Sequence, residues 1–161
     1  MECESVRLLS DMILYKPGGG SRPTYWHQDF PDHFNSIPEI TIWVALDDAT
    51  KASGCMWYVP GSHKRGEMVG YDFGDGSNIK EKGIDVSGAV FVEAKPGDLI
   101  IHHGLTLHYA GPNTTNSPRR AYINRLVNAK AAYRKNELLD GSKAEVIGQP
   151  LRDDDHPVIL P

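Results

Sequence analysis

A histidine and an aspartate stand two positions apart, as His27 and Asp29, in the aromatic-rich stretch YWHQDFPDHF (25–34). If this stretch ends a β-strand, alternation places both side chains on one face and turns Gln28 away. An imidazole and a carboxylate facing the interior lose much of their solvation unless a partner compensates them. The pair therefore predicts a shared metal ion or, alternatively, a simple hydrogen-bonded His–Asp pair.

A third metal ligand would have to come from a distant part of the chain. The segment PGDLIIHHGLTLHYAGPN (96–113) supplies His102, His103 and His108. We expect His108, which lies in a predicted strand before a turn, to be the ligand; His102 or His103 is the alternative, or else a hydrogen-bonding partner of the ligands. Two imidazoles and one carboxylate with open positions form the facial triad of non-haem Fe(II) oxygenases. Zinc hydrolases share this donor set but usually carry H-E-x-x-H, which this sequence lacks.

Two adjacent arginines, Arg119 and Arg120, open the strand predicted in SPRRAYINRL (117–126). Only one of them can face the interior of a sheet protein. A guanidinium there can clamp a carboxylate through two parallel hydrogen bonds. An Fe(II) site that uses 2-oxoglutarate needs such a cation for the distal carboxylate, so the triad and the clamp together favour that co-substrate. Two solvated surface arginines are the alternative.

Short apolar or alternating segments, separated by turn-forming residues, must position these side chains. They span residues 6–16, 23–29, 39–48, 55–60, 89–94, 98–103, 106–111 and 120–129. A polar, irregular excursion is expected over 71–88 and one short helix over 131–141. The pattern predicts a mainly β fold, of the all-β class, with few short helices. Periodicity alone does not choose among an immunoglobulin-like sandwich, a lipocalin-like barrel and a cupin-like roll.

Composition and length limit the function classes. With 161 residues, 40% hydrophobic residues and a net charge of −4, the sequence predicts one globular domain that binds no nucleic acid and no membrane. The absence of a signal-peptide pattern and the presence of only two cysteines predict a cytoplasmic protein with reduced thiols. His33, His63 and His156 fall in predicted loops, and we expect them to be surface histidines. The sequence does not indicate an oligomeric state.

Four segments in the same order resemble the phytanoyl-CoA dioxygenase family of Fe(II)/2-oxoglutarate-dependent oxygenases. They are WHQD (26–29), WVALDDATKASGCMWYVPGSHKRG (43–66), KPGDLIIHHGLTLHYAGPN (95–113) and RRAYINRL (119–126). The likeness extends from about residue 6 to about residue 130. It implies a double-stranded β-helix, or cupin-like jelly roll. We therefore expect a single jelly-roll oxygenase domain over 1–161, with an extended C-terminal tail from about residue 142.

The resemblance also implies roles for individual residues. His27, Asp29 and His108 would bind Fe(II), and Trp43 would line the 2-oxoglutarate site. Arg119 would bind the C5 carboxylate of 2-oxoglutarate, with Arg120 as the fallback. Halogenases of the family replace the carboxylate ligand by a small residue, so Asp29 favours a hydroxylase. The implied reaction hydroxylates a small organic substrate with dioxygen and releases succinate and CO2.

The sequence departs from the family pattern at two places. The family usually carries a helical region of several dozen residues before the roll, so the resemblance predicts that this sequence is N-terminally truncated. Tyr109 and Ala110 stand where the family often has Gly-Ser. The other functions compatible with the residues are a cupin-like metalloenzyme that does not use 2-oxoglutarate and a non-catalytic, truncated β-roll binding module.

Overall fold

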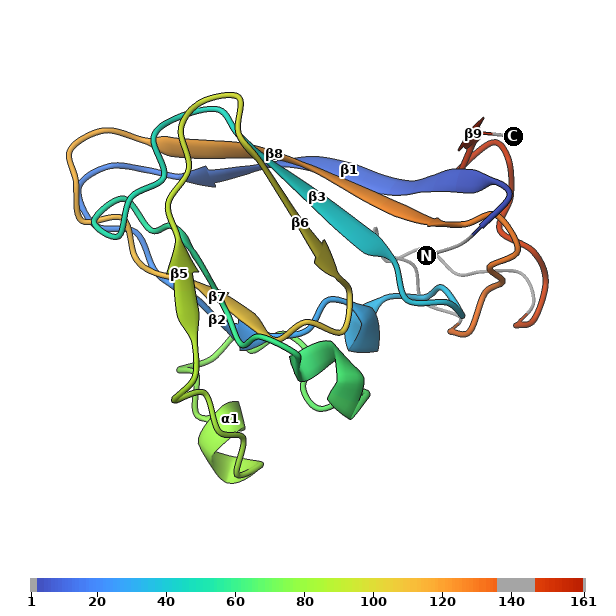
Figure 1. The fold of residues 1–161 in the computed structure, drawn as a ribbon, viewed down its shortest axis with the longest axis horizontal. Helices are drawn as coiled ribbons and strands as arrows, with labels where there is room; N and C mark the ends of the chain where they lie inside the picture. The colour runs from blue at the N-terminus through green and yellow to red at the C-terminus, as the bar shows by residue number, and fades with distance from the viewer. Residues whose placement is uncertain (1–2, 136–146, 161) are drawn as a thin grey trace.

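The strands form two antiparallel sheets that face each other (Figure 1). The computed structural model describes residues 3–135 and 147–160. The larger sheet has the order β6-β3-β8-β1-β9 and the smaller one β2-β7-β4-β5. The strand bounds are β1 Val6–Lys16, β2 Thr24–His27, β3 Ile40–Ala45, β4 Met56–Tyr58, β5 Val90–Val92, β6 Leu99–His103, β7 His108–Ala110, β8 Arg119–Asn128 and β9 Val158–Leu160. The predicted jelly roll is confirmed.

Helical structure is scarce, as the sequence predicts. The described residues contain two 3-10 helices, η1 (Phe30–Asp32) and η2 (Ser62–Arg65), and one short α-helix, α1 (Asn78–Glu81). The α-helix lies in segment 71–88, which was expected to be irregular, and it is located outside the two sheets (Figure 1). In the described chain, no helix is long and apolar enough to cross a membrane.

The prediction of a helix over 131–141 is wrong for its first part, residues 131–135. Ala132 and Tyr133 instead form isolated β-bridges with Pro150 and Asn35. Tertiary pairing therefore overrides the local helical propensity of this segment. Residues 136–141 lie outside the described part of the chain.

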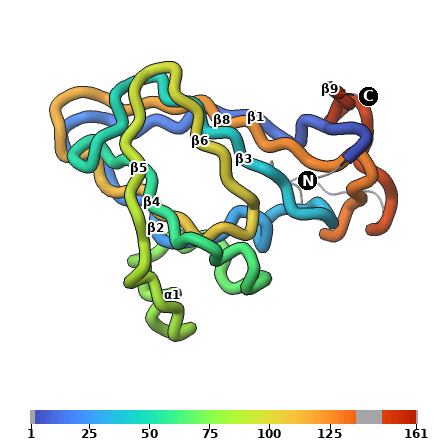
Figure 2. The backbone as a smooth tube through the Cα atoms, viewed as in Figure 1, coloured from blue at the N-terminus to red at the C-terminus, as the bar shows by residue number. Residues whose placement is uncertain are grey.

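One further strand, β9, was not expected from the sequence. It pairs with the beginning of β1, where Val6 lies opposite Leu160 and Arg7 opposite Val158. Figure 2 shows this C-terminal strand beside the N-terminal end of β1. The larger sheet therefore extends by one strand at the edge formed by β1.

Inward-facing side chains of the two sheets meet in a common core. Burial alternates along β8, so every second residue from its first position faces the smaller sheet. Trp43 and Ile123 from the larger sheet pack with Met56, Tyr58 and Ala110 from the smaller one. The sheet faces thus place a row of β8 and β3 side chains directly opposite β2, β4 and β7, where the candidate site lies.

Candidate metal centre

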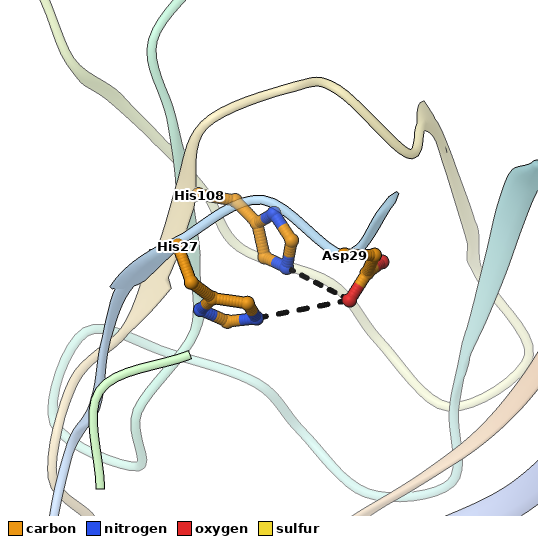
Figure 3. Close-up of side chains that lie close together, drawn as sticks. All are labelled: His27, Asp29 and His108. Carbon is orange, nitrogen blue, oxygen red and sulfur yellow. Dashed lines mark ion pairs between the residues drawn. The ribbon is translucent and has the colours of Figure 1, made fainter. Parts of the chain in front are cut away.

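Three donor side chains converge between the sheets (Figure 3). His27 ends β2 and His108 begins β7; the two residues are paired across the smaller sheet, with ring centroids 4.1 Å apart. Asp29 Oδ1 lies 3.7 Å from His27 Nε2 and 3.9 Å from His108 Nε2. Two atoms that share one metal ion at about 2.1 Å can be at most about 4.2 Å apart. Both separations are therefore compatible with one ion held between the imidazoles and the carboxylate.

Strand alternation is not what brings His27 and Asp29 together, contrary to the sequence-based expectation. Strand β2 ends at His27, and Asp29 has helical dihedral angles (φ −70°, ψ −49°) before η1. Gln28 is fully buried, and its Nε2 donates to the carbonyls of Gly66 (2.9 Å) and Leu105 (2.7 Å). A turn anchored by the Gln28 amide thus directs the carboxylate toward the histidines.

Backbone carbonyls fix the tautomers of the two histidines. His27 Nδ1 lies 2.7 Å from the Tyr25 carbonyl, and His108 Nδ1 lies 2.8 Å from the Thr106 carbonyl. A carbonyl only accepts, so each Nδ1 carries the proton and each Nε2 presents a lone pair. Burial lowers the pKa of His27, and it lowers that of His108 far more, so both rings are neutral at physiological pH. Neutral imidazoles are the form that binds metal.

The second oxygen of Asp29 is occupied by protein donors. Thr41 Oγ1 donates to Oδ2 at 2.9 Å, and His102 Nε2 lies 3.3 Å from the same oxygen. Tyr71 Oη donates to Oδ1 at 2.9 Å. Since Thr41 and His102 hold Oδ2, the carboxylate offers Oδ1 to an ion. This arrangement favours ligation through one carboxylate oxygen.

Asp29 is ionised although it is fully enclosed. Burial opposes its ionisation, yet its pKa lies well below the usual range because the hydrogen bond at His102 and the Arg125 guanidinium stabilise the carboxylate. The Arg125 guanidinium comes within 3.6 Å of Oδ1. The donor set therefore consists of two neutral imidazoles and one carboxylate.

The two other histidines of the segment 96–113 have different environments. His102 is buried beside the centre, where Tyr58 Oη lies 3.3 Å from its Nδ1 while its Nε2 contacts Asp29. This places His102 as a hydrogen-bonding partner of the carboxylate. His103 points away, and its Nδ1 accepts the Leu105 N–H at 3.1 Å.

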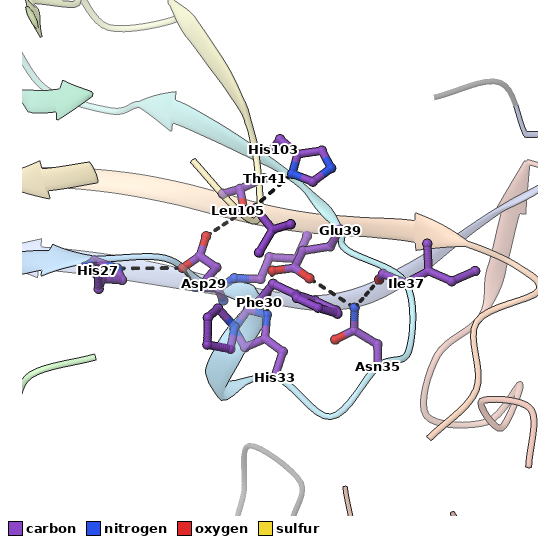
Figure 4. Close-up of polar contacts among 12 residues, drawn as sticks. His27, Asp29, Phe30, His33, Asn35, Ile37, Glu39, Thr41, His103 and Leu105 are labelled. Atoms are coloured by element: carbon purple, nitrogen blue, oxygen red, sulfur yellow. Dashed lines mark hydrogen bonds and ion pairs between the residues drawn. The ribbon is translucent and has the colours of Figure 1, made fainter. Parts of the chain in front are cut away.

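The expectation that the loop histidines lie on the surface is wrong for His33 and His156, which are both buried. His33 Nδ1 lies 2.7 Å from Glu39 Oε1, and Asn35 Nδ2 donates to Glu39 Oε2 at 3.0 Å (Figure 4). His156 instead bonds to a backbone carbonyl. Polar partners inside the fold therefore compensate both rings, and the turn-like sequence around them gives no sign of those partners. His63 is half-buried.

The buried Glu39 supports the turn that carries Asp29. Gly104 N–H donates to the Glu39 carbonyl at 2.8 Å, and Phe30 N–H donates to the Gly104 carbonyl at 3.1 Å. A Cβ at Gly104 would lie 2.6 Å from Glu39 Oε1. The close approach that glycine permits thus ties the residue after Asp29 to the end of β6.

The two adjacent arginines point in opposite directions. Arg119 is 1% exposed; its Nη2 donates to the Gly54 carbonyl at 2.8 Å, and its Cζ lies 5.4 Å from the Trp43 ring centroid. Its Nε and Nη1 have no hydrogen-bond partner among the described residues, and burial lowers its pKa to about 10. Arg120 is exposed and binds both oxygens of Asp47. Arg119 alone of the two is therefore available to an internal anion.

A cavity of about 70 Å³ lies beside the metal centre, and Trp43 and the three donor residues line it. Sequence reasoning missed several other lining residues, among them Thr41, Tyr71 and Arg125. Two of them were detectable, because strand alternation puts Thr41 on the same face as Trp43, and Arg125 on the same face as Arg119. Tyr71 comes from the irregular segment 71–88 and carries no local signal.

Comparison with known proteins identifies related sequences. The family model described as "Phytanoyl-CoA dioxygenase (PhyH)" matches residues 2–121. Phytanoyl-CoA dioxygenase 1 of Oryza sativa subsp. japonica is 32% identical over 118 residues, which cover 71% of this chain and 42% of the rice protein. The chain thus spans about two-fifths of the length of that curated relative.

Solved structures with a similar fold include two enzymes of nogalamycin biosynthesis. The epimerase SnoN, in complex with Fe3+, alpha ketoglutarate and nogalamycin RO, is 30% identical with a TM-score of 0.76, covering 96% of this chain and 65% of SnoN. The alpha ketoglutarate-dependent carbocyclase SnoK is 28% identical with a TM-score of 0.76, covering 96% of this chain and 62% of SnoK. The similarity therefore extends over nearly all of the chain.

Proposed function

Because the chain belongs to the phytanoyl-CoA dioxygenase family, we propose that it is an Fe(II)/2-oxoglutarate-dependent oxygenase that hydroxylates a small organic substrate. The observation that carries this proposal is the convergence of His27 Nε2, Asp29 Oδ1 and His108 Nε2 within 4.8 Å of one another. We assign these three side chains as the iron ligands. Two imidazoles and one carboxylate are the donor set that non-haem Fe(II) oxygenases use.

The residues present fit such an ion. Both histidine Nε2 atoms carry lone pairs, and Asp29 is ionised, so the ligand atoms need no deprotonation at physiological pH. When bound, Fe(II) with 2-oxoglutarate supplies the oxidising chemistry by activating dioxygen. The protein orients its ligands through the Tyr25 and Thr106 carbonyls, and it excludes bulk water by burying the whole donor set.

Arg119 is the residue we assign to the distal carboxylate of 2-oxoglutarate, with Trp43 forming the wall beside it. Two of its nitrogen atoms have no partner among the described residues, and a buried cation without an anion is unfavourable. A carboxylate would supply both the missing charge and the missing hydrogen-bond acceptors. The contact between its guanidinium and the Trp43 ring fixes its direction.

The presence of Asp29 supports hydroxylation over halogenation, because a halide would need the position that this carboxylate takes. SnoN and SnoK are an epimerase and a carbocyclase, so the same fold also serves other outcomes in those proteins. We further propose that residues 1–161 form one jelly-roll domain with a C-terminal tail from about residue 142.

The test is release of succinate and CO2 from 2-oxoglutarate with added Fe(II). The wild-type protein should turn over 2-oxoglutarate, and His27→Ala should lose this activity. His63→Ala changes a half-buried histidine on η2 and is the matched control, expected to retain activity. Turnover that survives His27→Ala, or no iron-dependent turnover in the wild type, would refute the proposal.

A further inference from the structure

A second buried guanidinium lies on the same strand face as Arg119. Arg125 lies on the same face of β8, is 3% exposed and lines the cavity. Six residues of strand separate the two arginines by about 20 Å. In the sheet register, Arg125 lies opposite Thr41, the residue that donates to Asp29. The Cα atoms of the two arginines are therefore well separated along β8, and Arg125 lies at the end of the metal ligands.

The hydrogen bonds of Arg125 are few and long. Its Nη2 lies 3.4 Å from Tyr71 Oη and 3.6 Å from Asp29 Oδ1, and its Nη1 lies 3.7 Å from Met12 Sδ. Its Nε has no partner among the residues that the structure describes. An ordinary N–H···O bond measures about 2.7–3.2 Å. A guanidinium has five donors, so most of the hydrogen-bonding capacity of this buried side chain is unused.

Asp29 compensates the charge of Arg125 fully only while no ion is bound. Ligation of a divalent cation commits the Asp29 carboxylate to that ion, which then adds positive charge beside Arg125. The distal carboxylate of 2-oxoglutarate is assigned to Arg119, whose Cα lies about 20 Å from that of Arg125 along the strand. With a divalent ion, the Asp29 carboxylate, the two carboxylates of 2-oxoglutarate and the two guanidinium groups, the loaded site has a net charge of +1. A buried excess of positive charge is unfavourable, and one further carboxylate would neutralise it.

We propose that Arg125, together with Tyr71 Oη, binds a carboxylate of the primary substrate, and that the substrate is a small organic acid. This inference rests on the proposed function. The Tyr71 ring stacks on His27 at a centroid distance of 4.0 Å, which holds the hydroxyl between the metal ligands and Arg125. Leu14, Met56 and Ile123 line the cavity and would contact the apolar part of such an acid. The planar guanidinium fork matches a carboxylate, whereas a neutral amide offers one acceptor and no charge.

The experiment measures binding without turnover. The full chain is loaded with redox-inert Zn(II) and saturating 2-oxoglutarate, which fills the Arg119 end. Linear carboxylates from propanoate to octanoate, and the matching primary amides, are then titrated by calorimetry. At least one carboxylate should bind roughly 30-fold or more tightly than its amide, the ratio expected when a buried charged pair loses one partner. Equal affinity of carboxylate and amide, or no binding of any carboxylate, would overturn the inference.

Variants locate the effect at Arg125. Arg125→Met should abolish the preference for carboxylate, and Arg125→Lys should retain part of it. Arg120→Met removes an exposed guanidinium of the same strand and should leave the preference unchanged. A preference for carboxylate over amide that persists in Arg125→Met would refute the assignment of Arg125. If that variant fails to fold, the comparison of acid with amide in the wild type still tests the inference. Failure to take up Zn(II) and 2-oxoglutarate refutes the proposed function itself, whereas uptake without the preference refutes only this inference.

Discussion

The substitution Asp29→Asn separates the role of the carboxylate as a metal ligand from its role in the fold. With its amide oxygen in the place of Oδ2, the new side chain still accepts from Thr41 and His102, as the carboxylate does at 2.9 and 3.3 Å. Its NH2 group takes the place of Oδ1, where it can donate to Tyr71 Oη and to the lone pairs of the histidines. The main loss in the metal-free protein is the 3.6 Å ion pair with Arg125.

The expected magnitudes differ between the two roles. Asp29→Asn should destabilise the metal-free protein by about 1.5–3 kcal/mol, the range for a hydrogen bond to a charged group. Asp29→Ala should cost about 3–5 kcal/mol, because it removes the same ion pair and also leaves the buried Thr41 and His102 without their hydrogen-bond acceptor. Metal at 100 times the wild-type Kd should stabilise the wild type by about 2.7 kcal/mol; a variant with roughly 100-fold weaker affinity gains only about 0.4 kcal/mol.

Urea unfolding with and without Zn(II) measures, for each protein, the free energy of unfolding of the metal-free form and the stabilisation that the metal adds. Asp47→Asn is the matched control, since it makes the same chemical change at an ion pair on the surface. This control should keep the full metal-dependent stabilisation. The reasoning is refuted if Asp29→Asn retains most of the stabilisation that metal gives the wild type, because the carboxylate would then not be a ligand.

Three further predictions concern the surrounding charges. Arg119→Met should raise the Kd for 2-oxoglutarate at least about tenfold, whereas Arg120→Met should change it less than twofold. Calorimetry on the Zn(II)-loaded protein measures both values, and equal effects of the two substitutions would contradict the assignment of Arg119. Burial and Arg119 lower the pKa of Lys16 from 10.5 to about 8. Between these two pH values the unfolded chain binds more protons than the folded protein, so the free energy of unfolding should rise as the pH increases from about 8 to 10.5. Urea midpoints measured across this interval should show the rise in the wild type and a flatter profile in Lys16→Met. Glu39→Ala leaves buried donors such as that of His33 unpaired and should lower the free energy of unfolding by about 2–5 kcal/mol; a loss below about 1 kcal/mol would contradict the structural role.

Strand periodicity predicted most of the fold because the two sheets bury one face each. The segment 6–16 coincides with β1, and its apolar and alternating residues, followed by the turn-forming residues after Lys16, are the signal that identified it. Strand β9 was missed because three exposed residues at a sheet edge carry no such alternation. The helix expected at 131–141 shows the opposite error, since bridges to distant residues decide the conformation of its described part.

The candidate site was predictable where residue type and spacing carry the chemistry. His27, Asp29 and His108 were selected in this way, and the structure brings them together. Tyr71 and the Glu39 network were not predictable, because long-range contacts place them and no local pattern records those contacts. The turn at Asp29 depends on the amide of a buried glutamine, which strand alternation treats as facing away from the site.

A crystal structure of the protein grown anaerobically with Fe(II) and 2-oxoglutarate would show which side chains bind the metal. We expect one ion at about 2.0–2.2 Å from His27 Nε2, Asp29 Oδ1 and His108 Nε2, with the distal carboxylate of 2-oxoglutarate on Arg119. An ion bound elsewhere, or one that uses His102 in place of any of these three ligands, would contradict this expectation.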